Sequence, residues 1–350
     1  MLKLSRAVVI VMLVTGCAGG NEGSQEAPTE EMNKEIDVVV ENLNVPWEIT
    51  KSDNTFYLTE RSGTIVEVAN GKVTRQPVDL SFSVHDEGEG GLLGMQLQDF
   101  SSSSTAFIYH TYQEQGVTLN RIVKVKLENG VWKETEELLS NIPGAQFHNG
   151  GRIKLGPDGK LYITTGDAGQ PELAQDVTSL AGKILRMNVD GTVPEDNPFE
   201  HSFVYSFGHR NPQGLAWDKN GQLYNSEHGQ SAHDEINEIE AGKNYGWPEI
   251  EGDEEKEGME TPLYHSGNDT WAPSGMLVYD DLLYVAGLRG EEIRTFKLDG
   301  SETKKYVDSI GRIRSLYQEE SMLYAITNNR DGRGNPVKED DRMVKIGVGE

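Results

Sequence analysis

The hydrophobic positions along the chain recur in short runs rather than on long helical faces. No stretch shows the 3.6-residue periodicity of a long amphipathic helix, whereas an apolar residue followed by tyrosine returns inside short runs typical of strands. The six copies are Phe56-Tyr57, Ile108-Tyr109, Leu161-Tyr162, Leu223-Tyr224, Leu283-Tyr284 and Leu323-Tyr324. Several follow turn dipeptides that favour tight hairpins, notably Asp158-Gly159 and Asn220-Gly221. The pattern predicts an all-β domain.

The spacing of the repeat indicates the architecture. Successive tyrosines lie between 40 (324 − 284) and 62 (224 − 162) residues apart. Propeller blades repeat every ~40–50 residues, whereas the strands of a β-sandwich, the alternative, would recur every ~8–12. The prediction is a six-bladed β-propeller over residues 36–350, with four-stranded blades around a central channel. Loops from different blades would converge at one end of that channel and share a pocket.

Composition restricts the partners of this domain. The 350 residues include 39 glycines and 36% hydrophobic side chains, which suits one large β domain with many turns. The formal net charge of −25 opposes binding to nucleic acid phosphates and anionic lipids. We therefore predict no nucleic acid partner, while clustered carboxylates would attract calcium.

The N-terminus resembles a bacterial lipoprotein signal. Lys3 and Arg6 precede the apolar run 7–14, which is too short to span a bilayer, and small residues lead into Cys17, the only cysteine. We predict a signal peptide over 1–16, lipidation of Cys17 and a flexible tether over 17–35. The protein would sit on the extracellular face of the bacterial membrane and touch it only through this lipid. An ordinary signal peptide with an incidental cysteine is the alternative.

Two polar residues on successive loops form the first candidate site. His148 lies in the glycine-rich segment 146–152, and histidine exchanges protons near neutral pH. Asp167 follows the third repeat strand and could accept a hydrogen bond from one imidazole nitrogen, which would leave the other free as a base. A structural histidine and an Asx turn are the alternatives.

Arginines occupy other loops of this acidic chain. Arg210, followed by Asn211, opens the fourth blade and presents a planar charge suited to carboxylates. Arg289 follows the fifth repeat strand, while Arg312 and Arg314 precede the sixth and point to one face of a strand. Converging arginines would bind an anion with several carboxylates, and surface ion pairs are the alternative. The acidic segments 226–230 and 234–237 favour calcium, although their spacing is not that of an EF-hand.

Taken together, the loops resemble the soluble quinone-dependent glucose and aldose sugar dehydrogenases. The resemblance extends from about Asn44 to Arg342. Its motifs are Gly88-Glu89-Gly90-Gly91-Leu92-Leu93-Gly94, His148-Asn149-Gly150-Gly151, Gly166-Asp167, Gly208-His209-Arg210-Asn211-Pro212-Gln213-Gly214, Asp234-Glu235-Ile236-Asn237 and Tyr245-Gly246-Trp247-Pro248. It implies oxidation of an aldose at the anomeric carbon to the lactone, with hydride transfer to calcium-bound pyrroloquinoline quinone and then electron transfer to an external acceptor.

The resemblance also implies roles for individual residues. His148 would take the proton of the anomeric hydroxyl, Asp167 would orient it, and Arg210 would stabilise negative charge on the quinone oxygen. The other residues implied at the cofactor are Glu89, Asn211, Arg289, Arg312 and Arg314, with Glu89 at the pocket edge near the substrate.

Calcium sites follow from the same resemblance. The carbonyl oxygens of Gly229 and Gln230 would ligate the calcium that polarises the quinone, and a second, structural calcium would involve Glu235 and Tyr245. Gln230 stands where proline is common, and Arg289 replaces a lysine, which keeps the charge and changes its reach. The short acidic segment 249–261 favours the broader aldose branch over the glucose-specific one.

Two other functions compete with this interpretation. A calcium-dependent lactonase is also a six-bladed propeller, but it has no use for the arginines and the histidine loop. A non-catalytic propeller that binds a protein or glycan is the second alternative, because fold does not determine function. The presence of His148, Asp167 and Arg210 together favours the dehydrogenase.

Overall fold

The computed structural model describes residues 35–98 and 100–348. The predicted signal peptide, Cys17 and nearly all of the tether lie outside the described residues and stay predictions. The first described strand begins at Ile36, where the predicted domain begins.

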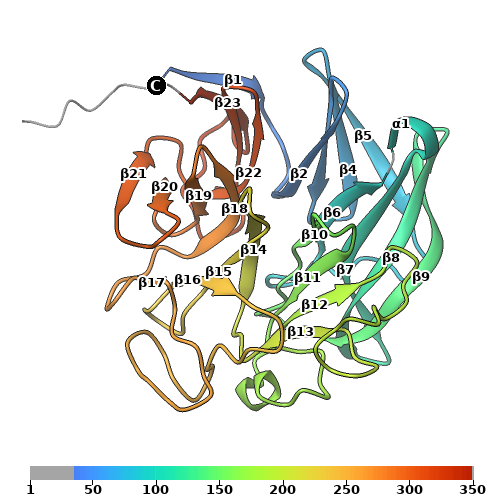
Figure 1. Ribbon diagram of the computed structural model, residues 1–350. Helices are drawn as coiled ribbons and strands as arrows, with labels where there is room; N and C mark the ends of the chain where they lie inside the picture. The colour runs from blue at the N-terminus through green and yellow to red at the C-terminus, as the bar shows by residue number, and fades with distance from the viewer. Residues whose placement is uncertain (1–34, 99, 349–350) are drawn as a thin grey trace, which may run out of the picture. The chain divides into compact units, whose positions relative to one another are not determined.

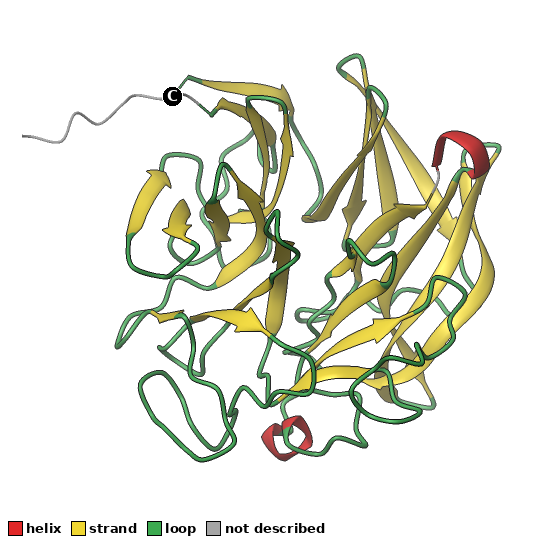
Figure 2. Ribbon diagram, in the orientation of Figure 1, coloured by secondary structure: helices red, strands yellow, loops and turns green. Residues whose placement is uncertain are grey.

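The strands of the described residues form five sheets, four with four strands and one with eight. Figures 1 and 2 show how these strands are arranged. The eight-stranded sheet contains, in chain order, β2 (Pro46–Ser52), β3 (Thr55–Glu60), β4 (Thr64–Ala69), β5 (Lys72–Asp79), β6 (Leu92–Gln98), β7 (Thr105–Glu114), β8 (Val117–Glu128) and β9 (Val131–Pro143). The next sheet contains β10 (Ile153–Leu155), β11 (Leu161–Thr165), β12 (Lys183–Met187) and β13 (Val204–Phe207).

The remaining sheets come from the second half of the chain, with one exception. One contains β14 (Pro212–Trp217), β15 (Leu223–Glu227), β16 (Glu235–Ile239) and β17 (Tyr264–His265), and the following one β18 (Pro273–Tyr279), β19 (Leu282–Gly287), β20 (Glu292–Lys297) and β21 (Thr303–Val307). The last contains β22 (Ile313–Glu319), β23 (Met322–Thr327), β24 (Met343–Gly347) and the N-terminal strand β1 (Ile36–Val40). Pairing of β1 with β24 joins the two ends of the domain (Figure 1).

Helices contribute little to the described part of the chain. They are α1 (Phe100–Ser103) and the 3₁₀ turn η1 (Pro171–Ala174). Neither they nor any other described segment provides an apolar helix long enough to cross a bilayer. The prediction of an all-β domain is confirmed.

The sheets follow one another around a ring. The two halves of the eight-stranded sheet join only through a short parallel pairing, Val78 with Trp132 and Asp79 with Lys133, whereas the other strand pairs are antiparallel. The contacts involve the first strand of each group of four. Strand β2 contacts both β6 and β22, and β6 contacts β10. Strand β18 contacts both β14 and β22. This arrangement is consistent with a propeller.

The repeated tyrosines occupy one position in this architecture. Each lies in the second strand of a group of four, namely β3, β7, β11, β15, β19 and β23. Some of them pack against aromatic rings of a neighbouring sheet: Tyr324 of β23 lies 4.7 Å from Phe56 of β3, and Tyr162 of β11 packs edge-on against Trp217 of β14. The repeat therefore reflects aromatic packing between sheets, which buries large apolar areas.

A buried ion pair connects four sheets. The Glu48 carboxylate on β2 lies 2.6 Å from Nη1 of Arg152, which directly precedes β10, and it also accepts the hydroxyl of Ser315 on β22 at 3.0 Å. Arg152 donates to the Gln213 carbonyl on β14 at 2.7 Å, and its guanidinium lies 4.2 Å from the ring centre of Trp47. Both charged side chains are almost fully buried. The pair therefore fixes the first strands of different sheets relative to one another.

Candidate active site

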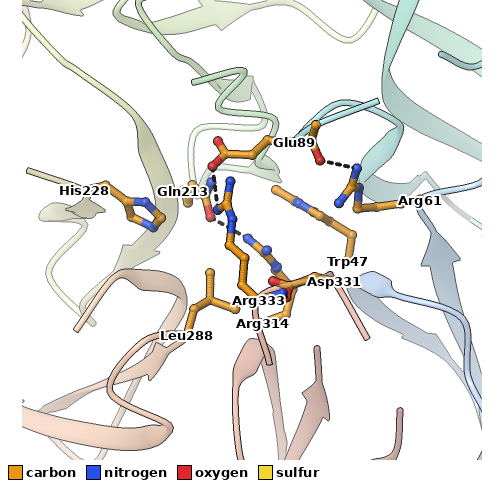
Figure 3. A pocket seen from close by; sticks show the side chains of 10 residues that line it. Trp47, Arg61, Glu89, Gln213, His228, Leu288, Arg314, Asp331 and Arg333 are labelled. Atoms are coloured by element: carbon orange, nitrogen blue, oxygen red, sulfur yellow. Dashed lines mark hydrogen bonds and ion pairs between the residues drawn. The ribbon is translucent and has the colours of Figure 1, made fainter. Parts of the chain in front are cut away.

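Residues from several sheets and their loops enclose a cavity (Figure 3). The sequence predicted such a pocket, shared by loops of different blades. Its lining residues are Trp47, Arg61, Gly88, Glu89, Gln213, His228, Leu288, Arg314, Asp331 and Arg333. Two of the predicted site residues, Glu89 and Arg314, belong to this lining. His148, Asp167, Arg210 and Asn211 form a hydrogen-bonded group next to it, connected through Glu89 and His228.

The predicted His148–Asp167 pair is present. His148 Nδ1 lies 2.7 Å from Asp167 Oδ1, and Nε2 has no partner among the described residues. Asp167 is completely buried and also accepts the amide of Gly169 at 2.8 Å and the indole N–H of Trp247 at 2.9 Å. Such a carboxylate holds the tautomer whose Nε2 can accept a proton.

The backbone around His148 is held in an unusual conformation. His148 has φ +59°, and its amide donates to Glu89 Oε2 at 3.1 Å. A Cβ on Gly166 would lie 1.9 Å from the His148 carbonyl oxygen, so this approach requires glycine. The loop thereby presents an imidazole that keeps 20% of its side-chain surface exposed. Strained conformations of this kind are often found at functional sites.

Arg210 is fixed on the other side of the pair. Its Nη1 donates to the carbonyl oxygens of His228 and Gly229 at 3.2 and 2.6 Å, and its guanidinium stacks 5.3 Å from the Trp247 ring. Burial lowers the pKa of Arg210, whereas nearby Asp167 and Glu227 oppose that shift. Trp247, which contacts both Asp167 and Arg210, is a site residue without a predicted role, although its motif was part of the resemblance.

Three buried nitrogen atoms next to the cavity have no hydrogen-bond partner among the described residues. They are Arg210 Nε, Asn211 Nδ2 and His228 Nε2. The Asn211 amide oxygen is engaged, accepting the Gly150 amide at 3.1 Å. A buried polar group without a partner costs free energy, so these atoms fit a ligand that supplies oxygen atoms to the cavity.

The three other predicted arginines differ in their surroundings. Arg312 pairs with Asp331 at 2.7 Å. Arg314 donates only to neutral groups, the side chains of Gln213, Ser274 and Asn328, and burial lowers its pKa to about 9. Arg289 is exposed, does not line the cavity and makes no side-chain hydrogen bond with the described residues. Arg314 thus places a positive charge in the cavity wall without a bonded carboxylate, which favours an anionic ligand.

The predicted calcium ligands lie in two places. The Gly229 carbonyl oxygen faces Arg210, and Gln230 is exposed on the same loop. Tyr245 uses its hydroxyl internally, donating to the Glu238 carbonyl at 2.7 Å. Burial and the charge of Glu227 raise the pKa of Glu235 to about 8. In residues 35–98 and 100–348, no three histidine, cysteine or carboxylate side chains converge as a metal centre.

Oxygen atoms nevertheless gather around Glu235. On the paired strands β15 and β16, Glu227 is opposite Glu235 and Asn225 is opposite Asn237. Buried Oδ1 atoms of both asparagines and Oε1 of Glu251 have no partner among the described residues. Calcium is bound by such mixed carboxylate, amide and carbonyl oxygens, so this cluster fits a cation.

Sequence reasoning did not identify several cavity residues. Arg61 follows the first repeat strand, and Asp331 and Arg333 follow the sixth, as Asp167 follows the third. This common position after the repeated tyrosine was the available signal. Trp47 and Gln213, in contrast, lie inside strands and received no predicted role, although Gln213 belongs to one of the motifs of the resemblance.

Comparison with known proteins agrees with this geometry. The sequence pattern of the family "Glucose / Sorbosone dehydrogenase" matches residues 43–336. Quinoprotein glucose dehydrogenase B of Acinetobacter calcoaceticus is 34% identical over 65% of this chain, and that match spans 55% of the length of the relative. Aldose sugar dehydrogenase YliI of Escherichia coli K12 is 28% identical over 85% of this chain and 91% of its own length.

A solved structure extends the similarity to three dimensions. The PQQ-bound form of aldose sugar dehydrogenase from Streptomyces coelicolor superimposes with a TM-score of 0.83 at 37% identity, covering 89% of this chain and 98% of the other. The matched region 43–336 includes every loop described above except the end of the loop between β23 and β24. The chain belongs to the glucose/sorbosone dehydrogenase family.

Proposed function

We propose that this protein is an aldose dehydrogenase that oxidises the anomeric carbon of a sugar to the lactone and uses pyrroloquinoline quinone with calcium. The observation that carries the proposal is the His148–Asp167 pair beside a cavity with unpartnered buried donors and the Arg314 charge. Membership of the family and similarity to a PQQ-bound aldose sugar dehydrogenase support the same activity.

The residues present fit the proposed cofactor. A polycarboxylate quinone would find cationic groups at Arg314 and Arg312, an amide donor at Asn211 and a guanidinium at Arg210. When bound, the quinone supplies a hydride acceptor, which none of the protein side chains can provide.

The protein's own groups handle the proton. Oxidation of a hemiacetal to a lactone removes a hydride from carbon and a proton from the hydroxyl. His148 Nε2, oriented through Nδ1 by Asp167, accepts that proton. Arg210, held over Trp247, provides positive charge near the reacting centre without needing to reorganise. Burial of Asp167 and Trp247 keeps water from competing for the Asp167 carboxylate.

A direct test uses protein purified without cofactor. Addition of pyrroloquinoline quinone and calcium is expected to allow an artificial electron acceptor to be reduced when aldoses are added, and omission of either should prevent it. A panel of aldoses would rank the substrates. Absence of reduction with every sugar, or absence of quinone binding at micromolar concentration, would contradict the proposal and favour a non-catalytic binding protein.

Calcium is expected to stabilise the folded protein through the Glu235 cluster. Calcium at 100 times its Kd would raise the free energy of unfolding by about 2.7 kcal/mol, because it binds only the folded state. Glu235→Gln should remove most of this increase, since the buried carboxylate that calcium would neutralise is lost. Thermal unfolding with calcium or magnesium measures the effect. If calcium raised the unfolding temperature of the wild type and of Glu235→Gln equally, the ion would bind at another site.

The proposal also includes the number of propeller blades and the location of the protein. We count the two halves of the eight-stranded sheet as separate blades, giving six, because the repeat occurs once in each half. Lipidation of Cys17 and attachment to the extracellular face of the membrane remain part of the proposal.

A further inference from the structure

Lys183 is the only buried lysine in the part of the chain that the structure describes, and the proposed mechanism assigns it no step. It begins β12, and its Nζ donates to three backbone carbonyl oxygens of the preceding loop. They belong to Leu173 at 2.8 Å, Ala174 at 3.0 Å and Ala181 at 2.6 Å. An ammonium group has three N–H donors and no acceptor, so these oxygens use its whole hydrogen-bonding capacity.

The charge of Lys183 is costly to bury. Burial lowers its pKa to about 7, and the charge of Asp176 on the same loop opposes that shift. No carboxylate of the described residues forms a hydrogen bond with its Nζ, so the carbonyl dipoles of the loop provide the direct compensation. Without the ammonium, the same three carbonyl groups would lose a shared donor and the loop its internal connection.

This loop, residues 166–182, also binds the segment that leads to Arg210. The Ala174 carbonyl accepts the amide of Gly208 at 2.9 Å in addition to the ammonium, and the Gly182 carbonyl accepts the amide of His209 at 3.2 Å. A Cβ on Gly182 would lie 2.5 Å from the His209 carbonyl oxygen, so the two segments approach closely. A displacement of the loop would therefore move the segment before Arg210.

The loop reaches Asp167 by two further routes. The Gly182 amide donates to the carbonyl of Gly166, the neighbour of Asp167, at 2.8 Å. Gln175, which follows η1, donates to the Trp247 carbonyl at 2.6 Å, and the Trp247 indole donates to the Asp167 carboxylate. Hydrogen bonds thus connect the loop to both sides of the candidate site.

We propose that Lys183 is a positioning residue for the dehydrogenase, whose ammonium fixes the loop 166–182. The fixed loop in turn holds Asp167 and Arg210 in their places around His148. Lys183 is not among the residues that line the cavity, so it acts through these side chains and not on the substrate or the quinone. This inference rests on the proposed function.

The experiment compares Lys183→Met with the wild type at pH 6, where the amine is protonated, in protein loaded with quinone and calcium. Methionine keeps an unbranched apolar side chain and removes all three donors. At saturating quinone, kcat for the best aldose should fall roughly tenfold to hundredfold, because small displacements of catalytic groups have effects of this size. KM for the sugar should be nearly unchanged. Expressing kcat per bound quinone excludes a loss of folded protein as the cause.

Lys160→Met is the matched control. It removes a lysine from the turn before β11, at the opposite end of the same sheet from Lys183. This variant should retain the wild-type kcat and KM.

Gln175→Leu tests the connection to Trp247 without a change beside the buried amine. It removes the donor to the Trp247 carbonyl and leaves the three carbonyl contacts of Lys183 in place. We expect kcat to fall by a smaller factor than in Lys183→Met, again with KM nearly unchanged. This variant tests the proposal even if Lys183→Met does not fold, because an unchanged kcat would show that the loop does not position the catalytic residues.

Hydrogen–deuterium exchange followed by mass spectrometry needs no turnover. Lys183→Met should exchange faster than the wild type in peptides covering 166–182 and 207–211, whose amides bind across the two segments, and equally fast in 282–287. Faster exchange with an unchanged kcat would show a purely structural role and overturn the proposal, as would unchanged exchange and unchanged kcat in an active enzyme. If the wild type oxidised no sugar and the local exchange still differed, the loop anchor would stand and the proposed dehydrogenase would be wrong.

Discussion

Replacing His148 with glutamine is expected to lower kcat for sugar oxidation by about 10²- to 10⁴-fold, the usual contribution of a general base. Glutamine can still reach the Asp167 carboxylate through its amide, so the loop should remain folded. It cannot accept a proton, because its amide nitrogen has no available lone pair. Steady-state dye reduction with quinone and calcium present measures the loss.

His201→Gln provides the matched control for this substitution. His201 is a surface histidine whose side chain is 89% exposed, and it is not among the residues that line the cavity. It should retain wild-type kcat. If His148→Gln kept more than a tenth of the wild-type rate while binding quinone normally, another group would be the base and the assignment of His148 would be wrong.

The Arg152→Met variant is expected to lose about 3–5 kcal/mol of unfolding free energy, because it leaves a buried carboxylate unpaired. Glu48 is fully buried, and Arg152 supplies its closest charge at 2.6 Å. Lys154 Nζ lies farther away at 3.6 Å. Urea unfolding followed by tryptophan fluorescence measures the loss. Lys219→Met, which breaks the exposed pair with Asp281, should leave the unfolding midpoint unchanged.

The difference in unfolding free energy between the wild type and Arg152→Met is expected to depend on pH. Burial raises the pKa of Glu48, but Arg152 and Lys154 outweigh it, so the folded-state pKa is lowered. The stabilisation is therefore present above the unfolded-state pKa of ~4.3 and is lost as the pH falls. Without Arg152, burial dominates and Glu48 protonates more readily, which removes the unpaired charge. The stability difference between wild type and variant should narrow towards pH 4, and a difference that widened would show that Glu48 is not the source.

Local sequence patterns predicted the features that depend on residues close together in the chain, namely the strands and the His148–Asp167 pair. The apolar-tyrosine pairs identified the second strand of every group of four, because strand alternation and hairpin turns are encoded within a few residues. The His148–Asp167 pair was also predictable, since the residues lie 19 apart on loops that flank one hairpin. Arg210 was a candidate from its loop, and the resemblance supplied its role at the quinone, because the local sequence pattern alone did not distinguish it from a surface arginine.

The closure of the sheets into a ring determined which residues far apart in the sequence meet at the cavity. Arg333 and Glu89 are 244 residues apart, and Glu48 and Ser315 are 267 apart, so no local periodicity connects them. They meet because β1 pairs with β24 and β2 contacts β22, which brings the first and last loops to one cavity. Arg314 on β22 lies in the cavity wall, whereas Arg289 in the turn after β19 is exposed, a difference that the two arginine-containing segments alone did not reveal. The sequence by itself determined the strands and the chemistry carried on their loops. Only the tertiary structure decided which of those loop residues share a site, because that depends on long-range contacts between sheets.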